Sequence, residues 1–475
     1  MKRFVSLVLA LIIIVLSCAS CGEERNVVMY TENFTVTDAM LSYYMYDYFN
    51  YLVSSYGYYF YYYYGFDYTA SLKEQYYDSS SGATWYDYFL YLATDSATFY
   101  LTFCEEAIRV GLSYYDEKFD TLIDREIETL ESTGESYGYS LDEYIKLCYG
   151  DITEDDVREA LRLFYLAQEY YNYFIDGLDY SDEELEECFA ENADDYTYVS
   201  YKVFDVEATY EDDADDETID EAYAAAEAAA NAIAKAEDSD EFDTLLSEYL
   251  TGHYADDDEM TDDDISSLVT AALIEDETID KDEDYSVWLF DDERELYDTT
   301  VIDDGEGTYT VYMVTSLAAR QTYFTKNVRH ILLSIENYDD EDACMEAAEA
   351  VLDEYISGGA TEELFIELAA KYSYDTGSAD TGGLYEDVML DEMVEEFEDW
   401  CYDGSRTAGE TGIVESDYGC HVMYFVGDGR EAWAAQMYEL LVEEAYEAEY
   451  DRVLDAYEVT SDLTGVNIVD INADS

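Results

Sequence analysis

Two short apolar runs bracket the stretch that decides the fold: Val328-Arg329-His330-Ile331-Leu332-Leu333 and Tyr418-Gly419-Cys420-His421-Val422-Met423. Each run has the composition of a buried strand and carries one histidine, and the whole chain has only three histidines. Histidine has an ordinary pKa near neutrality, so two histidines placed this way can indicate chemistry. Two buried histidines that only pack a sheet would give the same pattern. Spacing alone leaves both interpretations open.

The composition limits the possible partners. The chain has 475 residues, a formal net charge of −95 and 49% hydrophobic residues. This length suggests about three domains, and the apolar content is ample for packed cores. A chain with 116 acidic and only 21 basic residues repels the phosphates of nucleic acid, so no nucleic-acid partner is expected. The cysteines after residue 21 lack the spacing of a metal site or a disulfide framework. We therefore expect single buried thiols, no metal and no cofactor.

The N-terminus indicates where the protein resides. A basic start precedes an apolar run from Phe4 to Leu16, and small residues with two cysteines follow, Cys18 and Cys21. This is the pattern of a secretory signal peptide, here residues 1–21, whose apolar run is short for a membrane span. A cysteine at its end resembles the lipobox of bacterial lipoproteins, in which the cysteine receives the lipid. Both cysteines fit, and the resemblance implies an extracytoplasmic protein anchored by lipid to the cell membrane.

Residues 22–195 are predicted to form a helical domain. The sequence from Ser181 to Glu184 has the pattern of a capping box at a helix start. A tract between Tyr43 and Tyr68 is rich in tyrosine, whose ring is apolar and whose hydroxyl is polar. This tract indicates either a helix with broad burial or an exposed aromatic surface that holds unfolded chains.

The C-terminal residues 430–475 are expected to return to the helical domain. The periodicity from Trp433 to Tyr457 predicts one long helix. A last strand is predicted from Val466 to Val469. Its expected partner is the N-terminal strand at Val27 and Val28.

Residues 196–316 and 327–428, here called copy one and copy two, form an internal repeat. Each copy begins with a strand, continues with a helix, and later carries a similar aromatic helix and a glycine that leads into a strand. Aligning the two copies places Tyr201 over His330 and Tyr309 over His421. Copy one therefore has the same predicted fold without the two histidines, and is a degenerate version of copy two.

Copy two resembles the parvulin family of peptidyl-prolyl cis–trans isomerases over about 100 residues. Four motifs match in order: the opening histidine strand, the loop Tyr372-Ser373-Tyr374-Asp375 with a later Gly-Gly, the helix from Met393 to Phe397, and the closing histidine strand. The helical domain with its returning C-terminal helix resembles, by layout, that of lipoprotein foldases and periplasmic chaperones. The implied fold is α+β, with two parvulin-like domains inserted into a helical chaperone domain.

The resemblance also implies site residues, which are transferred by position. The paired histidines are His330 and His421, and Asp375 takes the position that is Cys or Asp across the family. The apolar pocket for the proline ring is expected from three side chains: Leu384, Met393 and Phe397. Isomerisation breaks no covalent bond but lowers a rotation barrier of about 18–20 kcal/mol. We therefore expect the polar residues to orient and polarise, and none to act as a nucleophile.

Copy two departs from the family in two places that concern the site. The loop after Leu333 is acidic where phosphate-directed parvulins carry basic residues, so phosphoserine–proline specificity is not expected. The spacing from Leu384 to Met393 is one residue longer than in comparable relatives.

The predicted function is a lipid-anchored extracytoplasmic foldase. It would isomerise Xaa-Pro bonds in unfolded or newly exported polypeptides and hold those chains. A non-catalytic holdase, in which both copies only bind extended chain, is the alternative. A solute-binding lipoprotein is disfavoured, because the repeat predicts two small modules rather than two large lobes. The sequence indicates no oligomeric state.

Overall fold

The computed structural model describes most of the chain, namely residues 25–211, 213–255, 259–375, 377–464, 466 and 468–472. The predicted signal peptide, with Cys18 and Cys21, lies outside the described residues. Within the described part of the chain, no helix is both long and apolar enough to span a bilayer. The chain divides into two compact units: Met1–Asp179 with Val442–Ser475, and Tyr180–Leu441.

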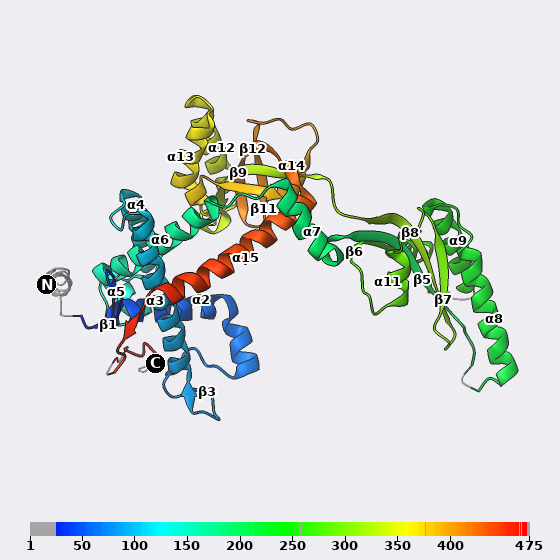
Figure 1. Cartoon of the computed structure of the whole chain (residues 1–475), viewed down its shortest axis with the longest axis horizontal. Coiled ribbons are helices and arrows are strands. Elements are labelled where there is room, and N and C mark those ends of the chain that lie inside the picture. Colours follow the sequence, from blue (N-terminus) through cyan, green and yellow to red (C-terminus); the bar gives the residue numbers. More distant parts are fainter. Residues whose placement is uncertain are drawn as a thin grey trace. The chain divides into compact units, whose positions relative to one another are not determined.

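The first unit is mainly helical, as the sequence predicts (Figure 1). Its helices are α2 (Asp38–Tyr64), α3 (Trp85–Val110), α4 (Glu117–Tyr137), α5 (Leu141–Tyr149), α6 (Glu154–Asp176) and the later part of α15 (Ala432–Ala456). Its strands are β1 (Val27–Tyr30), β2 (Thr35–Thr37), β3 (Tyr76–Asp78), β4 (Ala83–Thr84) and β13 (Thr460–Ser461). The helices share one apolar core, in which Tyr46, Phe89 and Phe103 have no exposed surface.

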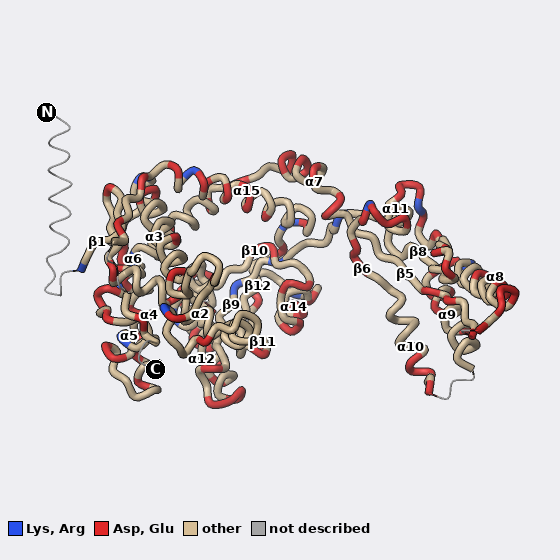
Figure 2. The backbone as a smooth tube through the Cα atoms, turned by 90° about the horizontal axis from the view of Figure 1, so that it is seen from below, with Lys and Arg blue, Asp and Glu red and all other residues tan. Residues whose placement is uncertain are grey.

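Helix starts are set by capping residues and acidic first turns. Thr153 caps α6 through a capping box with Asp156, and Ser181 forms the predicted capping box with Glu184 at α7 (Asp182–Tyr196). Acidic side chains near a helix N-terminus are favoured by the helix dipole. α6 and α7 each have three acidic residues in the first turn. Figure 2 shows that Asp and Glu outnumber Lys and Arg along the chain.

The tyrosine-rich helix α2 combines both predicted alternatives along its length. Its first part is buried, including Tyr43, Tyr44 and Tyr46. Its last turns expose tyrosines that are 48–81% accessible: Tyr51, Tyr56, Tyr58, Tyr59, Tyr61, Tyr62, Tyr63 and Tyr64. The helix thus contributes to the core at one end and presents an aromatic surface at the other.

The C-terminal segment returns to β1, but through a different strand from the one predicted. Ser461 and Thr460 of β13 pair antiparallel with Met29 and Tyr30. The predicted strand from Val466 to Val469 is therefore wrong where the structure describes it. There the Val469 carbonyl accepts a 2.6 Å hydrogen bond from the buried Tyr46 hydroxyl, so the segment is fixed by side chains rather than by a ladder.

The second unit contains two four-stranded antiparallel sheets with the same strand order (Figure 1). Copy one has β5 (Tyr198–Glu207), α8 (Asp216–Ile233), α9 (Ser239–His253), α10 (Asp262–Ala271), β6 (Leu273–Glu277), α11 (Asp284–Leu289), β7 (Thr299–Asp303) and β8 (Thr308–Ala319). Copy two has β9 (Phe324–Ser334), α12 (Glu341–Ser357), α13 (Glu362–Tyr372), β10 (Leu384–Val388), α14 (Glu395–Tyr402), β11 (Thr411–Ser416) and β12 (Gly419–Glu431). The orders are β6-β5-β8-β7 and β10-β9-β12-β11, so the predicted repeat is present in the structure.

Each sheet has a different helix layer on its two faces. In copy two, α12 and α13 cover one face around Ile331 and Val422, whereas α14 covers the other around Val328 and Met423. The alternation along β9 and β12 follows from the two-residue period of a strand. His330 is two residues from Val328 along β9, so its side chain points to the same face of the sheet, the one that α14 covers. The predicted α+β class is confirmed.

The sheet register corrects one part of the repeat alignment. Tyr309, which the alignment placed over His421, packs with Val206 in the core on the α8 side of copy one. His330 pairs with the residue two positions after His421, and Tyr201 pairs with the residue two positions after Tyr312. Tyr312 is therefore the counterpart of His421. The connection between β7 and β8 is longer than that between β11 and β12. The alignment of the two sequences did not allow for this difference, and so it placed a residue three positions too early over His421.

Candidate active site

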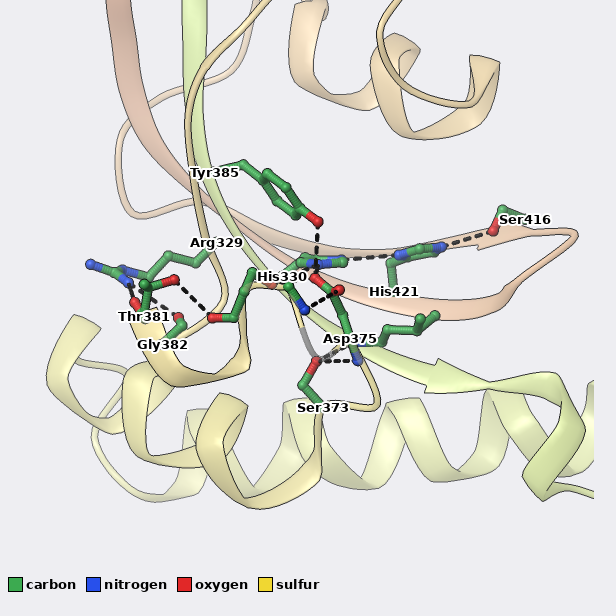
Figure 3. A network of polar contacts seen from close by, with 12 residues as sticks. Arg329, His330, Ser373, Asp375, Thr381, Gly382, Tyr385, Ser416 and His421 are labelled. Atoms are coloured by element: carbon green, nitrogen blue, oxygen red, sulfur yellow. Dashed lines mark hydrogen bonds and ion pairs between the residues drawn. The ribbon is translucent and has the colours of Figure 1, made fainter. Parts of the chain in front are cut away.

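His330 and His421 face each other across the two central strands of copy two (Figure 3). Their Nδ1 atoms lie 3.1 Å apart, and the two rings are stacked with centroids separated by 5.4 Å. Only 4% of His330 and 5% of His421 is exposed. The two predicted histidines are thus in direct contact, in a site that is largely shielded from water.

Asp375 completes a row of polar groups with the histidines. Its Oδ2 lies 2.7 Å from Nε2 of His330, and the Tyr385 hydroxyl donates to the same oxygen at 3.0 Å. The Ser378 hydroxyl also donates to this oxygen and lies 3.2 Å from Nε2 of His330. The backbone N–H of Gly377 donates to the other carboxylate oxygen at 3.0 Å. The carboxylate is therefore held by several donors.

The loop after α13 places Asp375 because it is attached to β9 at both ends. At its start, the N–H of Leu332 donates to Ser373 Oγ at 3.1 Å, and the Tyr374 N–H donates to the Leu332 carbonyl at 2.8 Å. At its end, the His330 N–H donates to the Gly383 carbonyl at 2.8 Å. Gly383 has φ +74°, and a Cβ there would lie 2.1 Å from the His330 carbonyl oxygen. Only glycine fits this approach.

The hydrogen-bond chain has one consistent direction when both imidazoles are neutral. An ionised Asp375 can only accept, so Nε2 of His330 donates to it and Nδ1 of His330 is an acceptor. Nδ1–H of His421 then donates to that atom, and Nε2 of His421 accepts from the Ser416 hydroxyl at 2.8 Å. Ser416 Oγ in turn accepts from the Tyr418 N–H at 3.2 Å. One carboxylate thus fixes the tautomers of two histidines.

The pKa shifts of His421, Asp375 and Tyr385 agree with the roles of these three side chains in the hydrogen-bond chain. Burial, together with the nearby His330, lowers the pKa of His421 from 6.5 to about 4, against the smaller opposing effect of Asp375. Burial alone would raise the pKa of Asp375, but the hydrogen bonds from His330 and Ser378 hold it well below its usual range. Burial and the adjacent Asp375 raise the pKa of Tyr385 to about 12. At neutral pH, His421 is uncharged, Asp375 is ionised and Tyr385 is a donor.

Phe397 forms the apolar side of the site. Its ring meets those of His330 and His421 edge-on, with centroid distances of 5.5 and 5.6 Å, and only 2% of it is exposed. Met393, which is half-buried, packs in the same cluster, one turn before Phe397. Both predicted pocket residues therefore lie together beside the histidines.

The structure does not bring Leu384 to this pocket. Leu384 pairs with Arg329, whose side chain bonds Glu362 and the Thr381 carbonyl at 2.9 and 2.8 Å. The neighbouring Tyr385 faces the site instead, with its ring 5.2 Å from that of His330. A shift of one residue moves a strand side chain to the opposite face, which explains the error. If Tyr385 takes the pocket position in place of Leu384, the spacing to Met393 is no longer one residue longer than in comparable relatives.

Three hydroxyl groups of the site were not predicted: those of Ser378, Tyr385 and Ser416. Serine is too common in loops and turns for its chemistry to be read from one sequence. Tyr385 could have been found, because it lies two residues after the Gly383 that pairs with His330. Among the described residues, no group of three His, Cys, Asp or Glu side chains is arranged to hold a metal ion.

Copy one fills the corresponding position with tyrosines. Tyr201, Tyr285 and Tyr312 occupy the places of His330, Phe397 and His421, and Tyr285 stacks on Tyr312 with centroids 5.0 Å apart. Glu277 occupies the position in the β5–β6 ladder that Tyr385 occupies in the β9–β10 ladder. Its carboxylate accepts hydrogen bonds from the hydroxyls of Tyr201 and Tyr285. Helix α10 is found where copy two has the Asp375 loop. Copy one therefore keeps the scaffold and loses the histidine pair.

The arrangement in copy two suits noncovalent chemistry on a polar bond beside an apolar group. The histidines and Asp375 form a preorganised polar row, and Phe397 with Met393 form the adjoining apolar wall. Asp375, Ser378 and Tyr385 bond to one another, and Asp375 and Ser378 orient His330. Such a site favours a change in the charge distribution of a bound group without forming a bond to it.

Comparison with protein-family models supports this site. A family model described as the PPIC-type PPIASE domain matches residues 311–427. No curated protein matches the chain. Among solved structures, PrsA from Bacillus subtilis is 12% identical, with 81% of this chain and 93% of that chain covered and a TM-score of 0.28. PrsA from Bacillus anthracis is 13% identical, with 62% and 94% covered and a TM-score of 0.20.

The peptidyl-prolyl isomerase ESS1 from Candida albicans is 22% identical, with a TM-score of 0.19. This match covers 22% of the present chain and 63% of that protein. The family match includes β9 to β12 almost completely, and with them both histidines, Asp375 and Phe397. Copy two, which lies within the matched residues 311–427 except for its last residue, is therefore a parvulin-type peptidyl-prolyl isomerase domain.

Proposed function

We propose that copy two isomerises Xaa-Pro bonds in exported polypeptides, with His330, His421 and Asp375 as its polar groups. The observation that carries this proposal is the hydrogen-bonded row from Ser416 to Asp375 beside Phe397. The proline ring of the substrate packs against Phe397, Met393 and Tyr385. The peptide bond then lies next to the histidine pair.

Catalysis follows from the loss of amide resonance during rotation. The planar amide has partial double-bond character, which gives a barrier of about 18–20 kcal/mol. In the twisted state the nitrogen is more basic and the carbonyl less polar. A shielded site with oriented donors binds the twisted state better than the planar one, which lowers the barrier. Asp375 acts as a positioning residue, since it reaches the substrate through His330.

A protease-coupled assay on Xaa-Pro peptides tests the proposal. His330→Ala and Asp375→Ala should each lower kcat/KM by roughly 100-fold, as expected for the removal of preorganised polar groups. His253→Ala is the matched control, because the third histidine is exposed at the end of α9 in copy one. An inactive wild type, or two fully active variants, would refute the enzyme assignment.

The same proposal includes the domain boundaries and the extracytoplasmic location of the protein. We assign residues 22–195 with 430–475 to the chaperone domain, and residues 196–316 and 327–428 to the inserted copies. Of the chaperone domain, residues 180–195 and 430–441 belong to the second compact unit. Residues 1–21 direct export, and either Cys18 or Cys21 receives the lipid. Fatty-acid labelling of cells that express the chain should persist in one of the variants Cys18→Ala and Cys21→Ala and vanish in the other. Equal labelling in both variants would contradict a single lipidation site.

Holding of unfolded chains is a second proposed activity, favoured by the exposed end of α2. Tyr58, Tyr62 and Tyr63 are 81%, 68% and 67% exposed, and residues 51–66 contain no charged side chain. Exposed aromatic surface of this extent is typical of binding sites. Replacing these three tyrosines with serine should weaken suppression of client aggregation. The control replaces Tyr115 and Tyr137, which are equally exposed elsewhere; an equal loss in the control would refute the assignment.

A further inference from the structure

Two of the three cysteines of copy two lie together in its core. Cys344 belongs to α12 and Cys420 to β12, and they are only 1% and 3% exposed. The Cys344 thiol donates to the Leu333 carbonyl at 3.0 Å, and Cys420 is the ladder partner of Leu333. Both cysteines belong to the one buried cluster between the sheet and α12. Both side chains therefore meet at one point of β9.

The cysteines of the chain were expected to be single thiols, because no regular spacing relates them. The six described cysteines are free thiols, as expected, and five of them are buried. Two of them, Cys344 and Cys420, are 76 residues apart in sequence but share one buried cluster. Cys401, the third cysteine of copy two, packs on the opposite face of the sheet with Phe397. Copy one has no cysteine. The pair is thus specific to the copy that carries the histidines.

We propose that Cys344 and Cys420 form a disulfide bond when the chain folds in an oxidising environment. The bond would join α12 to β12 at the residue immediately before His421. It would therefore hold the β12 backbone that positions the histidine pair. The proposal uses the proposed extracytoplasmic address only for the source of oxidising conditions, and does not depend on isomerase activity.

The oxidant is a small external disulfide, such as glutathione disulfide. One cysteine thiolate attacks it, which forms a mixed disulfide and releases one thiol. The second cysteine then attacks the protein sulfur of the mixed disulfide and releases the second thiol. Two protein thiols become one disulfide, the external disulfide is reduced to two thiols, and the two protons pass to these products.

The bond is expected to form before the core closes. In the folded chain, burial and contact with Cys344 raise the pKa of the Cys420 thiol to about 12, so almost none of it is ionised. The thiolate is the reactive form, and buried protonated thiols are inert. Oxidation during folding should therefore succeed where oxidation of the reduced, folded protein is slow.

Peptide mapping of the full chain tests the proposal. Trypsin places the three cysteines of copy two on three different peptides: 330–371 with Cys344, 372–406 with Cys401, and 407–430 with Cys420. The chain is unfolded, refolded in a glutathione redox buffer, alkylated, and digested without reduction. We expect a linked species of 330–371 and 407–430, lighter than their sum by two hydrogen atoms. Cys401→Ala should keep this species and Cys344→Ala should abolish it.

Thermal unfolding gives an independent measurement. A disulfide that closes a loop of this length restricts the unfolded chain, so the oxidised protein should melt several degrees above the reduced protein. Cys344→Ala should show no such difference. Alkylation of Cys344 and Cys420 on separate peptides after oxidative refolding would overturn the proposal, as would linkage of either one to Cys401. Either result would leave the proposed isomerase function unaffected.

Discussion

The two copies differ in their site and agree in their scaffold. Both have a four-stranded sheet of the same order with helices on both faces. Copy two has His330, His421 and Phe397 at the centre, and copy one has Tyr201, Tyr312 and Tyr285. The tyrosines stack on one another and bond to Glu277, so the fold is satisfied without histidine. The histidine pair in copy two is therefore not needed for packing.

The comparison also shows what the histidines require. Asp375 orders their tautomers and arrives on a loop that copy one replaces with helix α10. A tyrosine hydroxyl needs only one acceptor, whereas a pair of neutral imidazoles needs a fixed acceptor at one end and a donor at the other. Copy one therefore lacks both the histidines and the loop that would order their tautomers.

Truncation of Phe397 in copy two and of Tyr285 in copy one should give the largest difference in isomerase activity between the two copies. Phe397→Ala should destabilise copy two by about 3–5 kcal/mol, because the ring is buried, and should remove most of the isomerase activity. Tyr285→Ala in copy one should leave kcat/KM unchanged. Chemical denaturation measures the first effect, and the peptide assay measures both activities. Equal losses of activity in the two variants would show that copy one takes part in turnover.

Acidification should weaken copy two more than copy one. The unfolded chain takes up a proton on its histidine near pH 6.5, whereas folded His421 does so only near pH 4. Stability at this position is therefore unaffected above pH 6.5 and falls as the pH drops to about 4, by up to about 3 kcal/mol. Tyr312, whose pKa burial raises to about 12, contributes nothing in this range.

Amide hydrogen exchange measures this difference within one molecule. After correction for intrinsic rates, β12 should lose protection between pH 6.5 and 4 to a greater extent than β8. In His421→Tyr the excess loss should disappear. Parallel behaviour of β8 and β12 in the wild type would contradict the neutral state of His421.

Removal of a single hydroxyl should give the smallest effect. Tyr385→Phe removes the donor to Asp375 and keeps the ring beside His330. One hydrogen bond is worth about 1 kcal/mol, so kcat should fall roughly fivefold. As a control, Tyr285→Phe removes a hydroxyl–carboxylate bond to Glu277 in copy one and should leave kcat unchanged. A normal rate for Tyr385→Phe would show that Asp375 is held without this hydroxyl.

The sequence predicts the elements whose pattern is local and repeated. Copy two, its histidines, Asp375, Met393 and Phe397 follow from ordered motifs, and the structure brings them together. The two wrong site assignments made from the sequence are errors of strand register. Leu384 was predicted to line the pocket in place of Tyr385, because neighbouring residues of a strand face opposite sides of the sheet. Tyr309 was aligned with His421 in place of Tyr312, because the connection between β7 and β8 is longer than that between β11 and β12.

Other features depend on contacts that no local pattern records. Ser378 and Ser416 contribute through hydroxyls that occur throughout loops and turns. Cys344 and Cys420 lie on a helix and on a strand, 76 residues apart in sequence, so only the folded chain shows that they share one cluster. The edge of β1 opposite β2 pairs with β13 and not with the predicted strand from Val466 to Val469.

Exchange of the site residues between the copies tests the central claim most directly. The rate of cis–trans exchange of an Xaa-Pro peptide is measured by NMR with two full-chain variants. His330→Tyr with His421→Tyr should reduce exchange to the uncatalysed rate, whereas Tyr201→His with Tyr312→His should retain the wild-type rate. Retained catalysis in the first variant, or loss in the second, would contradict the assignment of isomerisation to copy two.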